Sequence, residues 1–196
     1  MQDELSYDRY HTKASQIYRI ALTSRATGNL SEMASTPAPL GPAVQRTYPE
    51  VLQFARIFPL FQKALVRQGE KRFYEENILV ADASLFEMFT FPVQSGDTKT
   101  ALQDPYAVVI TEKMAKKYFG AEDPIGRPLI FWNNTSYHVT GVLKQMPVQS
   151  HLTFDMVIPI SSSTIANYQY DHFLEEWWDW SCYTYVLLQE GVDFGT

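Results

Sequence analysis

Alternating apolar and polar positions in the first third of the chain predict a strand between two helices. Residues 17–26 (IYRIALTSRA) present one apolar face and one mostly polar face, which is the period of a strand. Residues 5–14 predict a short helix. A second helix is expected over residues 37–48, with Thr36 as its N-terminal cap. Prolines near its start interrupt helical hydrogen bonding, so its regular part is expected to begin only near Pro42.

The middle of the chain is richer in β-forming segments. Three apolar runs predict short strands over residues 52–58, 63–68 and 73–82. Residues 68–71 (QGEK) have the composition of a hairpin turn between the second run and the third. Residues 83–91 (ASLFEMFTF) predict a short amphipathic helix.

A strand, a helix and a turn are predicted between residues 107 and 126. Residues 107–110 form an uninterrupted apolar run, which is typical of a buried strand. Thr111 is a favourable N-cap for the helix that follows, and Gly120 supplies the left-handed conformation that ends many helices. Asp, Pro and Gly within residues 123–126 indicate a type I turn.

The rest of the chain continues with strands and one more helix. Strands are expected over residues 129–132, 137–143, 154–160 and 183–189, and a helix over residues 168–178. The complete pattern holds eight or nine strands and four or five short helices in mixed order. The expected class is therefore α+β, or a two-lobed α/β arrangement.

Composition and charge narrow the class of protein. The 196 residues are 45% apolar and 14% aromatic, which is enough to build a core, and no apolar run reaches the length of a membrane helix. The first residues lack the pattern of a signal peptide. The chain is therefore expected to be either cytoplasmic or the soluble part of a larger membrane protein. A net charge of −6 and the lack of a dense Lys/Arg cluster argue against nucleic-acid binding.

Three lysines on the helix predicted after Thr111 are the first candidate site. Lys113, Lys116 and Lys117 fall on the side opposite the apolar positions. A phosphate-binding turn needs glycine-rich backbone before the helix, and the three residues before this helix include no glycine. A solvated helix face is the favoured interpretation, and a contact patch for a partner is the alternative.

A histidine with two glutamates is the second candidate. His172, Glu175 and Glu176 lie on one face of a predicted helix, where they would be able to hold a metal or exchange a proton. Their spacing is not that of the HExxH motif, and no second histidine is near. Ordinary pairing on a helix surface is therefore favoured over a metal site.

A hydrolase that uses His151 or Cys182 is a third functional option. Ser150 and His151 are adjacent and Asp155 follows, but adjacency along the chain does not make a Ser-His-Asp triad. A turn in which Ser150 and His151 satisfy backbone groups is favoured. The single cysteine, Cys182, has no partner for an internal disulfide and is favoured as a buried thiol. No catalytic, cofactor-binding or metal-binding residue is assigned.

A cluster of aromatic residues near the end of the chain has two interpretations. The cluster consists of Trp177, Trp178, Trp180, Tyr183 and Tyr185. If exposed, it would form a platform for a glycan or a peptide, and the chain would be a soluble binding domain. If buried, it belongs to the core, and this interpretation is favoured because large aromatic side chains carry so much apolar area.

Six blocks of sequence resemble, in the same order, the extracytoplasmic region of MacB-type ABC-transporter permeases in their Bacteroidetes-like form. The blocks are LSYDRYHTKASQIYRI, TPAPLGPAVQRTYPEV, ILVADASLFEMFTFPVQSGD, AVVITEKMAKKYFGAEDPIGRPL, YHVTGVLKQMPVQSHLTFDMVIPIS and TYVLLQEG. They cover most of the chain, and together they are specific for this family, although each alone is weak.

The resemblance implies a two-lobed periplasmic core domain of the α+β class. Residues 1–60 and 155–196 are expected to form a porter-like α/β lobe, and residues 61–154 an inserted β-rich, sabre-like lobe. The family usually continues into a further helix, so the second part of the porter-like lobe is expected to be truncated. The implied location is the periplasmic face of the inner membrane.

The resemblance also implies a function without catalysis. Such a domain couples ATP-driven motion of the membrane helices to export of an antimicrobial peptide, a drug or a lipoprotein, or to a periplasmic partner. The implied partners are the membrane spans of the parent permease, a cytoplasmic ATP-binding subunit, a periplasmic adaptor and a second copy in a dimer. The candidate contact residues are Lys113, Lys116, Lys117, Trp177, Trp178 and Trp180.

Overall fold

One long mixed β-sheet runs through the molecule. The computed structural model describes residues 10–24, 31–60, 62–132, 134–147, 150–162 and 172–192. Eleven of the described strands form the sheet in the order β1-β13-β4-β7-β12-β9-β11-β10-β5-β6, with β8 paired to β11, and β2 and β3 form a separate hairpin. The predicted α+β class is confirmed.

The elements are short, and strands predominate. The strands are β1 (Ile17–Arg19), β2 (Leu22–Ser24), β3 (Ser31–Met33), β4 (Val51–Pro59), β5 (Ala64–Gln68), β6 (Lys71–Glu75), β7 (Ile78–Ala81), β8 (Val93–Gly96), β9 (Ala107–Thr111), β10 (Pro128–Phe131), β11 (Thr135–Leu143), β12 (Met156–Pro159) and β13 (Tyr183–Leu188). The helices are α1 (Leu40–Thr47), α2 (Leu85–Met88) and α3 (Glu112–Phe119).

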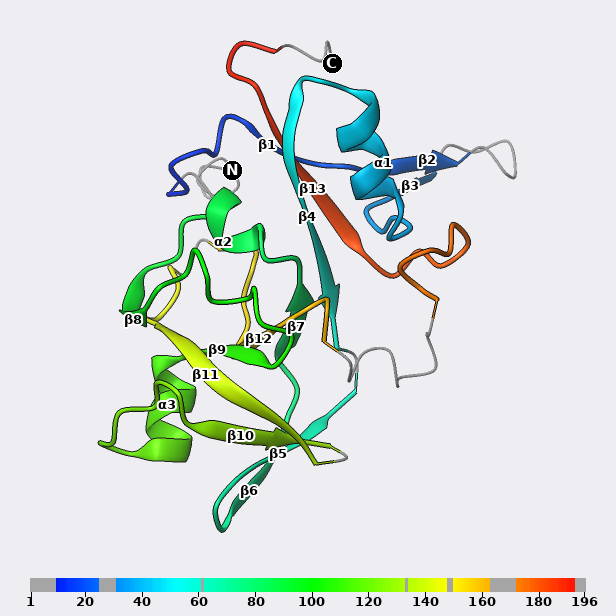
Figure 1. Ribbon diagram of the computed structural model, residues 1–196. Helices are drawn as coiled ribbons and strands as arrows, with labels where there is room; N and C mark the ends of the chain where they lie inside the picture. Colours follow the sequence, from blue (N-terminus) through cyan, green and yellow to red (C-terminus); the bar gives the residue numbers. More distant parts are fainter. Residues whose placement is uncertain are drawn as a thin grey trace.

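Segments from both ends of the chain meet at one end of the sheet. Strand β13 pairs antiparallel with β1 on one side and with β4 on the other. Helix α1 packs on β4, and it does so closely: a Cβ atom added at Gly41 would lie 2.7 Å from Cδ2 of Phe54. Figure 1 shows β1, β4, β13 and α1 gathered at the top of the molecule.

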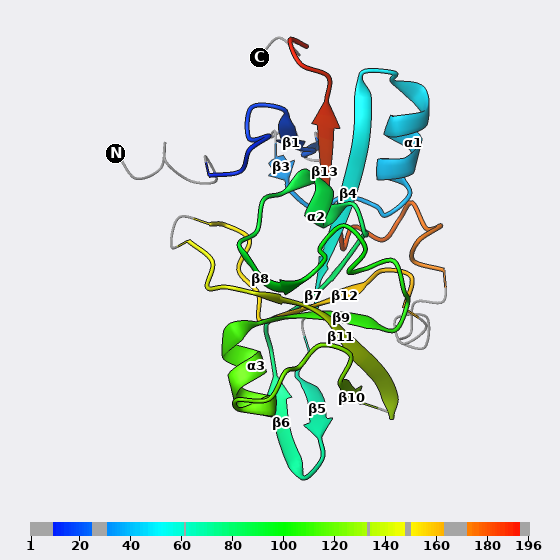
Figure 2. The ribbon, with the colours of Figure 1, turned by 60° about the vertical axis from the view of Figure 1, so that its left-hand side comes forward.

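Among the residues that the structure describes, those at the opposite end come from the middle of the chain. Strands β10 and β11 lie there with the β5–β6 hairpin and α3, and Figures 1 and 2 agree on this arrangement. The hairpin turn falls at residues 69–70, as predicted, and Gly69 has a φ of +55°. Between the two ends, β7 and β12 pair in parallel and continue the sheet. Strands β4 and β12 of the predicted porter-like lobe thus pair with β7 and β9 of the predicted sabre-like lobe. The division into lobes at residues 60 and 154 stays a prediction.

Hydrophobic clusters cover both faces of the central strands. In β9, Val108 and Ile110 belong to one cluster, while Val109 between them belongs to the other. Alternate side chains of a strand point to opposite faces, so a strand that is buried on both faces reads as a continuous apolar run. Helix α3 covers the first face through Met114 and Tyr118, and α2 contributes to the cluster on the second.

Several predicted elements near the N-terminus differ from those observed. The strand predicted over residues 17–26 is divided into β1, which pairs with β13, and β2, which pairs with β3 in the separate two-stranded sheet. Ile20, just after β1, still donates its N–H to Thr184 O of β13. The first half of the helix predicted over residues 5–14 falls outside the described residues, and the described residues 10–16 form turns and a bend instead of a helix. Helix α1 begins at Leu40, inside the predicted range 37–48 and two residues before Pro42, where its regular part was expected to begin.

The predicted N-caps are not made. Thr36 lies before α1 but bonds Cys182 and Thr184 instead of the helix. Thr111 occupies the N-cap position of α3 with an extended backbone, yet its side chain makes no capping bond. Helix α3 ends at Gly120 as predicted, and the N–H of Gly120 bonds Lys116 O. Its φ of +68° is positive as expected, but its ψ of −116° differs from the left-handed helical conformation.

Three predictions in the rest of the chain need correction. The type I turn predicted at residues 123–126 is shifted by one residue: Arg127 donates to Pro124 O, and Gly126 at the third position has a φ of +75°, as type II turns require. The run 73–82 is divided between β6 and β7, which have different neighbours. The helix predicted over residues 168–178 lies partly outside the described residues, and the described residues 172–175 form a turn.

Candidate functional site

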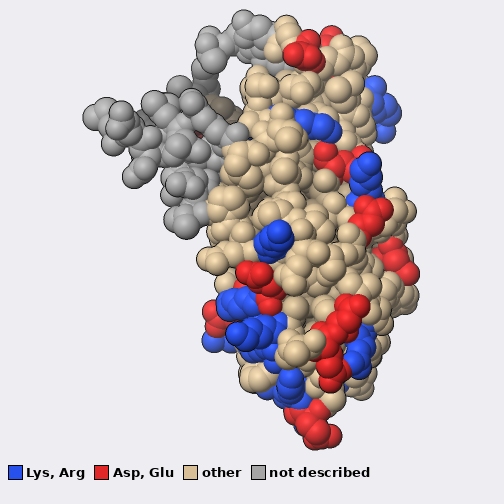
Figure 3. All heavy atoms as spheres, turned by 90° about the vertical axis from the view of Figure 1, so that its left-hand side faces the viewer, with Lys and Arg blue, Asp and Glu red and all other residues tan. Residues whose placement is uncertain are grey.

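The lysines of α3 form contacts to other elements and are not a uniform solvated face. The Nζ atom of Lys113 lies 3.1 Å from Asp155 Oδ2, and that of Lys117 lies 2.6 Å from Glu75 Oε1. Lys116 is exposed. Figure 3 shows Lys and Arg side chains interspersed with Asp and Glu over the lower part of this side of the molecule. The solvated interpretation holds for Lys116 and for the mostly exposed Lys113, while Lys117 is half-buried in a tertiary contact.

Glu75 is the buried acceptor of this region, and no sequence pattern identified it in advance. Tyr118 donates its hydroxyl to Glu75 Oε1 at 2.5 Å, and Lys71 donates to Tyr118 O at 2.5 Å. Burial, followed by the hydrogen bond and charge of Glu75, raises the pKa of Tyr118. Lys117 also lies 4.4 Å from the ring centroid of Phe73. These contacts fasten the β5–β6 hairpin to α3.

A broad groove lies along α3. It has a volume of about 1480 Å³, and its walls come from α3 and residues 120–124 after it, from β8, from the end of β11 and from the segments around residues 145 and 154. Lys113 and Asp155 of its lining pair with each other, while Glu112, Lys116, Glu122 and Asp123 also line the groove, so carboxylates outnumber lysines along it. Among its described lining residues there is no histidine or cysteine, so the groove offers neither a thiol nucleophile nor an imidazole base.

Ser150, His151 and Asp155 do not converge. Ser150 Oγ donates to Leu152 O at 3.0 Å, and His151 Nε2 lies 2.7 Å from the hydroxyl of Tyr185. Asp155 pairs instead with Lys113. Ser150 therefore satisfies a backbone carbonyl as predicted, and His151 bonds the side chain of Tyr185 in β13.

Cys182 is a packing residue. Its side chain is fully buried, and the residue pairs with Thr36 through backbone hydrogen bonds of 2.7 and 3.2 Å. Burial raises the pKa of the thiol to about 12, although Arg56 nearby acts in the opposite direction. The thiolate that nucleophilic chemistry needs is therefore not formed at neutral pH.

His172, Glu175 and Glu176 form a turn. The carbonyl of His172 accepts the backbone N–H groups of Glu175 at 2.8 Å and Glu176 at 3.0 Å. Within the ranges of the chain that the structure describes, no group of three or more His, Cys, Asp or Glu side chains is arranged to hold a metal ion.

The prediction that the aromatic cluster belongs to the core is wrong for its three tryptophans. Trp177, Trp178 and Trp180 are 51%, 89% and 45% exposed. Tyr185 is buried and Tyr183 is half-buried, because both belong to β13, whereas the tryptophans precede it in a loop. The observed exposure is the condition under which this cluster was expected to contact a ligand.

No helix in the described part of the chain combines the length and the apolar character needed to cross a bilayer. A comparison with curated proteins gives no match. The family model described as "MacB-like periplasmic core domain" matches residues 1–196.

Solved structures have the same fold at low sequence identity. A domain assigned to a permease protein from Porphyromonas gingivalis superposes with a TM-score of 0.75 at 22% identity, covering 94% of this chain and 78% of that one. The periplasmic region of MacB from Actinobacillus actinomycetemcomitans gives a TM-score of 0.62 at 14% identity, covering 96% of this chain and 78% of that one. The extracellular domain of the ABC-type transporter YknZ from Gram-positive bacteria gives a TM-score of 0.54 at 18% identity, covering 89% of this chain and 83% of that one.

Proposed function

Because the chain belongs to the family of MacB-like periplasmic core domains of ABC-transporter permeases, we propose that it acts as a mechanical element and catalyses no reaction. In this proposal, ATP hydrolysis by a cytoplasmic ATP-binding subunit moves the membrane spans of the permease. The domain passes that motion to a substrate or to a periplasmic adaptor. Candidate substrates are an antimicrobial peptide, a drug or a lipoprotein.

The observation that carries the proposal is the path of the sheet. Strands β1 and β13, which are the described strands nearest in sequence to the two chain ends, pair directly with each other. From this pair the hydrogen-bonded sheet continues through β4, β7 and β12 to the β5–β6 hairpin at the far end. Motion applied to both ends of the chain would therefore enter adjacent strands and reach the hairpin through continuous backbone pairing.

Side chains reinforce this path at its two junctions. Arg56 of β4 is bonded to Asp82 just after β7, and Glu75 of β6 is bonded to Tyr118 and Lys117 of α3. Buried polar contacts of this kind resist rearrangement, because separating them would leave the charge of Arg56 or Glu75 unpaired in the interior. Such a structure suits a lever that moves as one body.

The lobes and contact surfaces complete the proposal. The porter-like lobe would comprise residues 1–60 and 155–196, and the sabre-like lobe residues 61–154. We assign the exposed Lys116, with Lys113 and Lys117 beside it, to contacts with an adaptor or a second copy of the domain. Trp177, Trp178 and Trp180 form the second contact surface.

The proposal is tested by distance measurements in the full permease with its ATP-binding subunit. A spin label at Glu70→Cys reports on the hairpin turn, and one at Arg46→Cys reports on α1; Cys182 is fully buried and does not compete for the label. We expect the distance between the Glu70→Cys labels of two copies to change between the ATP-bound and nucleotide-free states. The distance from position 46 to position 70 within one copy should stay constant.

Two results would contradict this mechanism. An unchanged distance between copies would remove the coupling to ATP. A changed distance within one copy would show that the domain deforms and does not move as one body. An ATP-binding subunit that cannot hydrolyse ATP is the control, since it should hold the labels in one state throughout.

A further inference from the structure

A short loop before β13 exposes an unusual set of side chains. We call it the acidic tryptophan loop, and it consists of Leu174, Glu175, Glu176, Trp177, Trp178, Asp179 and Trp180. Its four apolar side chains are between 36% and 89% exposed. Large apolar side chains that gather on a surface mark sites of interaction, whereas single exposed ones need no explanation. The loop is therefore a candidate docking surface.

The loop is anchored at both ends. At its start, Phe173 is 5% exposed and its ring lies 5.5 Å from that of Phe58 in β4. At its end, Cys182 is held by backbone bonds to Thr36. Within the loop, Trp180 Nε1 donates to Trp177 O at 3.2 Å. The side chains are thus displayed from a fixed backbone, which lowers the entropy cost of binding.

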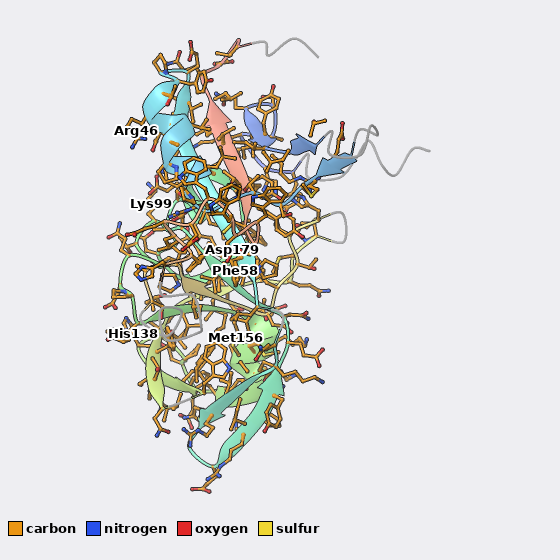
Figure 4. The ribbon with its side chains drawn as sticks, turned by 90° about the vertical axis from the view of Figure 1, so that its right-hand side faces the viewer. Arg46, Phe58, Lys99, His138, Met156 and Asp179 are labelled. Carbon is orange, nitrogen blue, oxygen red and sulfur yellow. The ribbon has the colours of Figure 1, made fainter. Side chains whose placement is uncertain are left out.

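The charge of the loop is negative and is not neutralised. All sixteen Lys and Arg residues lie within residues 1–144, whereas residues 145–196 hold seven carboxylates. Three of these carboxylates, on Glu175, Glu176 and Asp179, belong to the loop, and none of them forms an ion pair with the described part of the chain. Asp179 lies on the side of the molecule that faces the viewer in Figure 4, midway along its length. Residues 145–196 therefore supply no Lys or Arg side chain that would compete with an incoming cation.

We propose that the acidic tryptophan loop binds a cationic peptide segment, with Lys or Arg side chains placed over the indole rings and paired with the loop carboxylates. Tryptophan is the best aromatic partner for a cation, and guanidinium groups both stack on rings and pair with carboxylates. A neutral glycan would leave the three carboxylates without a partner. An anionic membrane surface would be repelled by them.

This inference names a partner chemistry for the tryptophan contact surface of the proposed function. The mechanical part of that proposal rests on the path of the sheet, whereas the loop lies outside the sheet. Failure of peptide binding would therefore leave the mechanical part standing, and the reverse also holds. The distance measurements described above do not involve the loop.

The test uses the chain as it stands and a fluorescently labelled octa-arginine peptide, with binding followed by anisotropy. We expect binding at low ionic strength that weakens as salt is added, since the pairing is exposed. Trp178→Ala should weaken binding about threefold or more, and Glu175→Gln with Glu176→Gln should do the same. Trp178 is 89% exposed, so its replacement should leave the fold intact. The circular dichroism spectrum checks this directly.

Matched controls lie at the far end of the molecule. Tyr74 is 68% exposed on β6, and Glu70 is exposed at the hairpin turn, so Tyr74→Ala and Glu70→Gln remove comparable groups from another surface. Both should bind the peptide as the unmodified chain does. The proposal is overturned if octa-arginine does not bind, or if it binds equally well after Trp178→Ala. It is also overturned if the loop variants lose binding to neutral oligosaccharides or to phosphatidylglycerol vesicles and keep binding to the peptide.

Discussion

Arg56 and Asp82 form a bidentate ion pair in which Arg56 Nε and Nη2 each lie 2.8 Å from a carboxylate oxygen of Asp82. The backbone N–H of Arg56 bonds the same carboxylate at 2.8 Å, and Arg56 Nη1 reaches Ala38 O at 3.1 Å. Burial alone would lower the pKa of Arg56, but the hydrogen bonds and charge of Asp82 outweigh it and raise that pKa. The pair connects β4, the residue after β7 and the segment before α1.

We expect Asp82→Asn to lower the free energy of unfolding by about 3 to 5 kcal/mol, because the Arg56 charge would stay buried without its partner. Urea unfolding followed by circular dichroism measures the change. The control is Glu76→Gln, which removes the exposed pair between Lys63 and Glu76. That variant should unfold at the same urea concentration as the unmodified chain. Equal losses for the two variants would mean that the buried pair has no special weight.

The contact between Tyr118 and Glu75 gives a second prediction. Tyr118→Phe removes the hydroxyl that Glu75 accepts and should cost about 1 to 2 kcal/mol, since a buried acceptor loses one of its donors. The loss should be local as well: amide hydrogen exchange in β6 should become faster, while exchange in β13 changes little. Tyr74→Phe, at a position that is 68% exposed, is the matched control and should alter neither quantity.

The sequence predicted the elements that depend on neighbouring residues, and it did not predict contacts between residues far apart in the chain. Residues 107–119 fold as the expected strand and helix. The apolar run becomes the fully buried strand β9, and Met114 and Tyr118, at helical spacing, become the buried side of α3. The hairpin turn at Gly69 was predictable for the same reason. The ion pair of Arg56 with Asp82 spans 26 positions, and the bond of Tyr118 to Glu75 spans 43. Nothing in the neighbourhood of either residue specifies such a partner.

The acidic tryptophan loop shows where apolarity alone misleads. Large apolar area favoured burial for Trp177, Trp178 and Trp180, but burial also requires a face for the side chain to cover. Strand β13 begins only at Tyr183, so the alternation that would have turned these tryptophans inward starts after them. Aromatic side chains are therefore buried or half-buried within β13 and exposed a few residues earlier, because only the residues of the strand have a face of the sheet to cover.

Two glycines with positive φ should respond differently to the same substitution. A Cβ at Gly96 would lie 2.3 Å from the carbonyl oxygen of Thr140, whereas at Gly69 nothing lies within 4 Å. Gly69→Ala should therefore cost only about 1 kcal/mol of backbone strain. Gly96→Ala adds a clash with the backbone of β11 and should cost clearly more, with loss of the β8–β11 pairing in hydrogen exchange. Similar costs at both positions would mean that β8 can move aside without penalty.

Cys182 supplies a test of the core that depends on pH. Its thiol is fully buried and its pKa is raised from 9.0 to about 12 by burial, so the folded state holds the thiol proton more tightly than the unfolded state does. This contribution to stability is complete below pH 9 and is lost as the pH rises from 9 toward 12. We expect the stability advantage of the unmodified chain over Cys182→Ala to shrink over that interval. Groups that titrate in both chains cancel in this comparison.

The burial of Cys182 also predicts how it reacts. At pH 8 a thiol reagent should react with Cys182 only at the rate of unfolding. Rapid reaction in the native state would show that the packing between Thr36 and Cys182 is open.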